Sequence, residues 1–212
     1  MRITVTGTSR ITLPAECVAV NLTLGFTGPD RDSVVTDTAA VTDRIRERLE
    51  AAASTGAVRD TKLTSLRSWT STPLNARGKT QPPQHTAEVR GSFMVVELPA
   101  LGELLGELAA APGVQVGWLD WRLRDSTLAE VQPRALADAF DDAHRRAEWI
   151  STAARRGGVE AVAIQDQGGG IAPMAFAMKA SREMMMDSAP SINLDPQDVE
   201  ISVSLTVEFT AA

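Results

Sequence analysis

The sequence predicts an α+β fold, with a mostly antiparallel or mixed sheet of about seven strands and three helices on one face. Several segments alternate apolar and polar residues, which is typical of strands with one covered and one solvated face. Three other segments repeat apolar residues at steps of three and four, which is typical of amphipathic helices. Doubly wound parallel sheets are covered on both faces, so the alternation disfavours them and indicates the α+β class.

Length and composition limit the classes of protein. The chain of 212 residues is expected to form a single domain over 1–212. A net charge of −6 and the lack of a basic stripe disfavour a nucleic-acid partner. Cys17 is the only cysteine, which excludes an intrachain disulfide. No apolar run approaches the length of a transmembrane segment and no signal-like segment opens the chain, so a cytoplasmic location is expected, or a periplasmic or envelope-associated one if an export signal was removed.

Two strands and a helix are predicted at the start of the chain. Residues 3–8 alternate apolar residues and glycine with threonines, and residues 18–27 alternate again, so a hairpin-like pair around Pro14 is expected. Cys17 has the parity of Ala19 and Asn21, which places it on the solvent face. Residues 33–53 form the first predicted helix, with an apolar face of Val34, Thr38, Val41, Ile45, Leu49 and Ala52.

The middle of the chain contains two more predicted strands, a loop, a short helix and a further strand. Residues 61–72 and 87–95 have strand composition, and residues 75–84 contain Gly and Pro without periodicity and are predicted to be a loop. Residues 101–109 form a short leucine-rich helix. The strand after it alternates Leu119, Trp121 and Leu123 with charged residues.

The longest helix is predicted over residues 134–156, with Pro133 in its first turn and Gly157 after its end. Because much of its apolar stripe is alanine, the helix can approach a sheet closely. The stripe consists of Leu136, Ala139, Phe140, Ala143, Ala147, Ile150 and Ala154. Residues 160–165 form a short strand, and 168–196 is a Gly/Met/Pro-rich loop insertion with a helix over 176–185. Residues 199–209 show the cleanest strand alternation in the chain.

Four stretches together resemble the SIMPL-domain family. They are the Val5-x-Gly7 start with Pro14-x-Glu16, the first helix ending near Gly56, the long helix with its spaced alanines, and the terminal strand 198–209. This group of unknown function includes bacterial periplasmic antigens and proteins linked to oxidative-stress defence. The resemblance implies an α+β fold and assembly into closed oligomers, and it supplies no catalytic residues. The chain departs from the family in lacking an export signal, in Glu16 for the usual Asp, and in residues 195–198 where a Pro-Gly turn is usual.

Motifs that could carry chemistry are sparse. His144 and Glu148 lie one helical turn apart, but with two histidines in the chain and no H-E-x-x-H arrangement, an exposed pair is favoured over a metal site. The glycines at 168–170 could bind an anion, although the spacing fits a flexible linker better. There is no G-x-S-x-G elbow, and Cys17 has no resolving cysteine. We therefore expect no catalytic, cofactor-binding or metal-binding residues and no cofactor.

The expected function is that of a non-enzymatic SIMPL-like protein, a self-assembling scaffold or binding module with a stress-response role. The alternative is a small-molecule binding protein or enzyme with a site between the Met-rich loop and the sheet. Trp118 and Trp149 are the candidate oligomer interface, because large aromatic residues on polar faces are enriched at protein interfaces. Trp149 lies about 120° from the centre of the predicted stripe. The competing interpretation is that loops of the same chain cover both tryptophans.

Overall fold

The structure is a computed structural model that describes residues 1–74, 80–173 and 195–212. Its contacts divide the chain into two compact units, each with its own antiparallel sheet. Of the described residues, unit 1 holds 1–15, 122–173 and 197–212, and unit 2 holds the others. The predicted α+β class is confirmed, and the strands are divided between two sheets instead of forming one.

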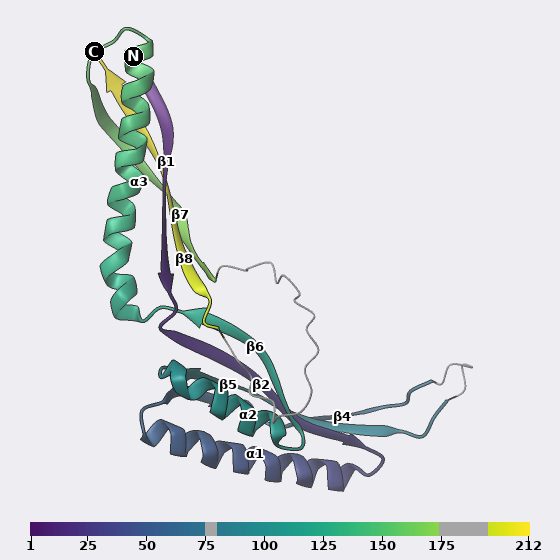
Figure 1. Cartoon of the computed structure of the whole chain (residues 1–212). Helices are drawn as coiled ribbons and strands as arrows, with labels where there is room; N and C mark the ends of the chain where they lie inside the picture. Colours follow the sequence, from purple (N-terminus) through teal and green to yellow (C-terminus); the bar gives the residue numbers. More distant parts are fainter. Residues whose placement is uncertain (75–79, 174–194) are drawn as a thin grey trace, which may run out of the picture. The chain divides into compact units, whose positions relative to one another are not determined.

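Unit 1 is a three-stranded sheet with one long helix. Its strand order is β1 (Arg2–Pro14), β8 (Asp198–Ala211) and β7 (Val159–Pro173), and helix α3 (Asp125–Ala153) runs along β1 and β8 (Figure 1). In β8 every second residue from Val199 to Ala211 is buried, as the alternation predicted. The central strand therefore presents a continuous apolar face to the helix.

The predicted hairpin between the first two strands is wrong. β1 pairs with β8 along all of its 13 residues, with Val5 opposite Val207, whereas β2 (Cys17–Gly28) belongs to the sheet of unit 2. Alternation in the sequence identifies the covered face of a strand, but it carries no information on which strand pairs with it.

Helix α3 begins at Asp125, before the predicted start at Arg134, so Pro133 lies inside it. Proline removes one backbone donor, but Leu128 and Leu136 on either side of it still face the sheet, and this packing continues the helix. The predicted stripe is confirmed in part. Ala139, Ala143 and Ala147 are buried, Leu136 and Phe140 are half-buried, and the buried face also includes Ala135 and Ser151. Ile150 is 44% exposed, because it lies about 60° away from Ala147 on the flank of the helix, and Ala154 is exposed beyond the helix end.

The two flanks of α3 hold different parts of the sheet. On one flank Arg146 Nη1 donates to the carbonyl oxygen of Thr6 at 2.5 Å, and the Thr8 amide donates to Asp142 Oδ2 at 3.1 Å. These side chains satisfy outward-facing backbone groups of the edge strand β1. On the other flank, the rings of Phe140 and His144 lie 6.3 and 5.6 Å from the ring of Phe209 in β8.

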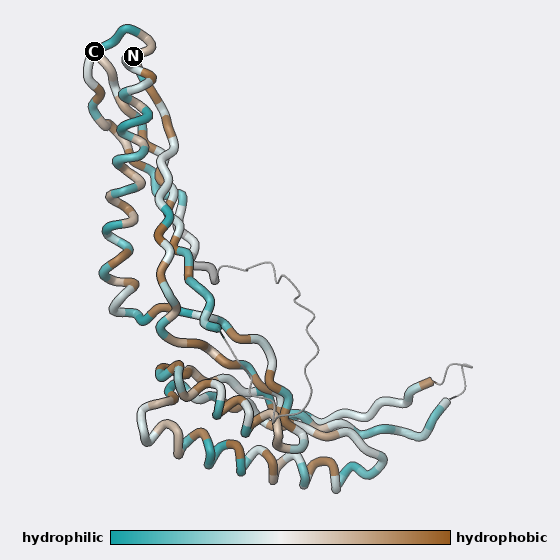
Figure 2. Tube along the Cα trace, viewed as in Figure 1, coloured by the Kyte–Doolittle hydropathy of each residue, from teal (hydrophilic) through white to brown (hydrophobic). Residues whose placement is uncertain are grey.

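Unit 2 contains the strands β3 (Val58–Leu63), β5 (Gln84–Val95), β2 and β6 (Val114–Arg122) in that order, and β4 (Arg67–Ser71) also pairs with β5. The predicted strand 61–72 is thus two strands, which pair with different stretches of β5. Helix α1 (Arg31–Ser54) alternates hydrophobic and hydrophilic stretches along its length (Figure 2). All six residues of its predicted apolar face are buried, and Asp30 caps its start by accepting from the Ser33 amide.

Two shorter helices complete unit 2. They are the 3₁₀ helix η1 (Leu98–Ala100) and helix α2 (Leu101–Ala110), whose leucines 101, 104, 105 and 108 are buried. Arg48 Nε of α1 lies 2.6 Å from Glu107 Oε2 of α2, so an ion pair joins the two helices.

The predicted loop 168–196 is wrong for its first six residues. Residues 168–173 continue β7 past the predicted end at 165, because a register shift between Asp166 and Gly169 takes up the extra residues. Gly168 has φ +81° there, a left-handed conformation that favours glycine. The predicted helix 176–185 and the methionines of this stretch lie outside the described residues, as do residues 75–79 of the other predicted loop.

Candidate functional site

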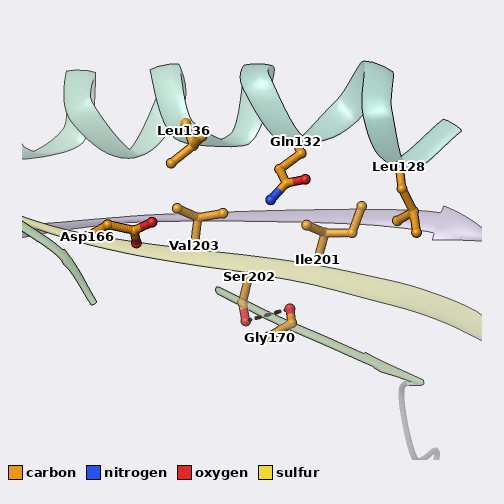
Figure 3. Close-up of a pocket in the computed structure, with 8 residues that line it drawn as sticks. All are labelled: Leu128, Gln132, Leu136, Asp166, Gly170, Ile201, Ser202 and Val203. Carbon is orange, nitrogen blue, oxygen red and sulfur yellow. Dashed lines mark hydrogen bonds between the residues drawn. The ribbon is translucent and has the colours of Figure 1, made fainter. Parts of the chain in front are cut away.

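A cavity of about 100 Å³ lies between α3 and the sheet of unit 1 (Figure 3). Three positions of α3, spaced four residues apart, form its roof, and β8 and β7 form its floor and one side. The α3 side chains point toward the sheet, and those of Ile201 and Val203 point toward the helix. The lining residues are Leu128, Gln132, Leu136, Asp166, Gly170, Ile201, Ser202 and Val203.

The packing of α3 explains why the cavity lies near the start of the helix. Farther along, a Cβ atom added at Gly7 would lie only 2.8 Å from Ala143 Cβ, so no space is left there between helix and strand. Toward the start of α3, the residues that face β8 are the longer Leu128, Gln132 and Leu136. These side chains do not fill the space between the helix and β8 completely.

The register shift in β7 fixes the polar rim of the cavity. The Gly168 amide donates to Asp166 Oδ1 at 2.8 Å, which holds the carboxylate at the turn of the bulge. The hydroxyl of Ser202 donates to the carbonyl oxygen of Gly170 at 3.2 Å. In the described part of the chain Asp166 has no ion-pair partner.

The cavity combines an apolar interior with a few polar groups at its edge. Ile201 and Val203 are 4% and 6% exposed, whereas Gln132 and Asp166 are exposed. Such a combination suits a small molecule with an apolar body and a polar head. Among the described residues, the eight that line the cavity include neither histidine nor cysteine, so they offer no imidazole base and no thiol.

The cavity only partly matches the predicted small-molecule site. Of the residues in the stretch 168–196 that the structure describes, Gly170 alone lines the cavity, and the other lining residues come from α3, β7 and β8. Leu128 and Gln132 were missed because Pro133 was placed at the start of the helix. A four-residue spacing that continues through Pro133 was the available signal, and it is weak because proline usually marks a helix start.

The two candidate interface tryptophans are both exposed. Trp118 on β6 of unit 2 is 71% exposed, whereas Trp121 on the same strand is 4% exposed. Trp149 on α3 of unit 1 is 64% exposed and stands two positions from both Ala147 and Ser151, roughly 160° around the helix from each. Their role in an interface remains a prediction.

A third apolar surface lies on β7, which is an edge strand of the unit 1 sheet. Val162 and Ile164 are 54% and 59% exposed. Ile164 pairs with Val207, so it lies on the face that α3 covers at β8. Because α3 contacts β7 much less than β1 and β8, the described residues 160–168 are all exposed. We call residues 160–168 the β7 edge.

The pair of His144 and Glu148 is largely exposed. His144 Nδ1 lies 3.8 Å from Glu148 Oε1, with side chains 38% and 55% exposed, and the imidazole also contacts Phe209 edge-on. In residues 1–74, 80–173 and 195–212, no group of three His, Cys, Asp or Glu side chains is arranged to hold a metal ion.

Cys17 is buried, with 1% of its surface exposed, so its predicted placement on the solvent face is wrong. Alternation fails at the start of β2, where Cys17 and Val18 are buried consecutively.

Replacing Cys17 with serine is expected to lower the free energy of unfolding by about 1–2 kcal/mol, because a hydroxyl is costlier to bury than a thiol. Denaturant unfolding measures the loss, with Cys17→Ala as the apolar control. Rapid reaction of the native thiol with a thiol reagent would contradict the burial.

A protein-family model matches nearly the whole chain. The SIMPL family model, described as a protein of unknown function (DUF541), matches residues 3–209. The chain belongs to the SIMPL family. The match runs from β1 to β8 and includes both units, which confirms the resemblance carried by the sequence motifs. A search of curated proteins found no match. None of the described helices of this SIMPL protein is long and apolar enough to cross a membrane.

Proposed function

We propose that this SIMPL-family protein is a self-assembling scaffold or binding module without catalytic activity, and that it forms a homo-oligomer. The observation that carries the proposal is the difference between the two edges of the unit 1 sheet. At β1 the side chains of Asp142 and Arg146 bind outward-facing backbone groups. At the β7 edge, Val162 and Ile164 are exposed.

An exposed edge strand with apolar side chains is a template for pairing with another strand. Natural proteins protect such edges with charges, as β1 is protected here, or cover them with a partner. A second copy of the chain offers the same edge, so two copies can meet around a twofold axis. The β7 edge is therefore our first candidate surface for self-assembly.

Trp118 and Trp149 support the same proposal from other surfaces. Tryptophan is highly buried on average and is enriched where proteins contact one another. Trp118 on unit 2 and Trp149 on unit 1 are more exposed than Trp69, and both are available to neighbouring copies. We infer that at least one of them is buried between subunits.

Light scattering after size-exclusion chromatography tests the proposal. The wild type is expected to be an oligomer, and Ile164→Lys, Trp118→Arg and Trp149→Arg are expected to shift it toward smaller species. Trp69→Arg is a matched control, because Trp69 is 47% exposed and lies outside the proposed surfaces. A wild-type monomer would refute self-assembly, whereas three variants that all assemble like the wild type would refute the assignment of the surfaces.

The cavity in unit 1 supports small-molecule binding as a second candidate function, because it joins an apolar interior to a polar rim. The stress-response role and the cytoplasmic location also remain proposals. Survival of a deletion strain under oxidant and fractionation of cells expressing the native gene would test them separately.

A further inference from the structure

We infer that the cavity beneath the start of α3 binds a small alkylammonium ion, with the alkyl group inside and the ammonium group at Asp166. The cavity shares Asp166 with the β7 edge, but binding in it uses neither Val162 and Ile164 nor the tryptophans. The inference therefore deepens the second candidate function and does not depend on self-assembly. It rests on the size of the cavity, its apolar interior and the character of the polar groups at its rim.

The interior fits a short branched alkyl group. Four aliphatic side chains surround it, two from α3 and two from β8, namely Leu128, Leu136, Ile201 and Val203. The volume of about 100 Å³ far exceeds the roughly 15 Å³ that one water needs. A four-carbon group would exchange water-exposed surface for contact with these side chains, which is favourable.

The rim selects the head group. The Asp166 carboxylate and the Gly170 carbonyl can accept hydrogen bonds, and the Gln132 amide can both accept and donate them. The Asp166 carboxylate accepts one bond from Gly168 and has no cation beside it in the described residues. An ammonium group brings a positive charge and three donors, an alcohol brings one donor, and a carboxylate would be repelled by Asp166.

Nuclear magnetic resonance titration of the full chain with three probes of one shape tests the inference. Isobutylamine, isobutanol and isobutyrate share the same branched carbon skeleton and differ in the head group. We expect isobutylamine to bind most tightly and isobutyrate most weakly. The amine should shift the signals of Leu128, Leu136 and Ile201.

Variants separate the head-group contact from the cavity itself. Asp166→Asn should weaken isobutylamine binding about fivefold to tenfold, as expected for loss of a charged hydrogen-bond acceptor, and leave isobutanol unchanged. Asp141→Asn is the matched control, because Asp141 is an exposed carboxylate of α3 outside the cavity. Leu136→Phe, which fills the cavity, should weaken both the amine and the alcohol.

Three results would overturn the inference. They are no binding of isobutylamine, binding of isobutanol or isobutyrate as tight as that of the amine, and an Asp166→Asn variant that binds the amine as the wild type does. The comparison of the three probes uses the wild type only, so it decides the question even if a variant does not fold.

Discussion

Replacing Gly7 with alanine is expected to destabilise unit 1 by about 3 kcal/mol, the upper end of the cost of overpacking. A Cβ atom at this position would overlap the carbonyl oxygen of Ala139 and would lie 2.5 Å from Ala143 N and 2.8 Å from Ala143 Cβ. The first two contacts are with the backbone of α3, which cannot rotate away as a flexible side chain can. The strand and the helix must therefore separate, and the buried alanine stripe loses contact with the sheet.

Denaturant unfolding combined with hydrogen exchange measures this effect in the unit where it arises. Gly158→Ala is the matched control in unit 1, since a Cβ there meets nothing within 4 Å, and its effect should stay within about 0.5 kcal/mol. Gly7→Ala should speed exchange in β1, β8 and α3. If both variants unfold alike, β1 and α3 do not approach each other as closely as described.

Gly7 also shows what the sequence could predict about unit 1. The alternation in β1 and β8 identified two strands and their covered faces, because a half-buried strand needs apolar residues at every second position. The spaced alanines predicted a close helix contact. The sequence alone could not show why residue 7 is glycine, because the reason is the close contact with Ala139 and Ala143, which are distant in the chain.

The errors arise where local patterns meet long-range packing. Pro133 indicates a helix start by its own chemistry, yet packing on both sides of it continues α3. Cys17 follows the parity of the solvent face, yet the end of a strand does not keep that parity. The prediction that β1 pairs with β2 was wrong for the same reason, since pairing between distant strands has no local signal.

The candidate surfaces were predictable to different degrees. Trp118 and Trp149 stand at polar positions of their elements, and parity and helical angle were sufficient to predict their exposure. The cavity is assembled from α3, β7 and β8, and Asp166 reaches its rim through a bulge stabilised by Gly168. Strand alternation cannot locate a bulge, so no local pattern distinguished Asp166 from other exposed carboxylates.

In unit 2 the position at which an added side chain is expected to be most destabilising is Gly25 on β2. Gly25→Ala is expected to lower the free energy of unfolding by about 3 kcal/mol. A Cβ there would overlap the carbonyl oxygen of Ala87 on the neighbouring strand β5 and lie 3.2 Å from Glu88 Cα. The Gly25 amide also donates to the carbonyl oxygen of Gly113 at 2.8 Å, so the strand is held from a second direction and cannot shift without losing this bond.

Gly106→Ala is the matched control in unit 2, because Gly106 lies within α2 and a Cβ there meets nothing within 4 Å. That variant should be more stable than the wild type by about 0.5–1 kcal/mol, since alanine favours a helix over glycine. Hydrogen exchange should accelerate in β2 and β5 for Gly25→Ala and slow in α2 for Gly106→Ala. If Gly25→Ala keeps wild-type protection in β2 and β5, the close approach of these strands at Ala87 is wrong.

Protection of β1 and β8 in the same variant measures whether unit 1 remains folded when unit 2 is weakened. Loss of protection in both units together would mean that they unfold as one cooperative domain.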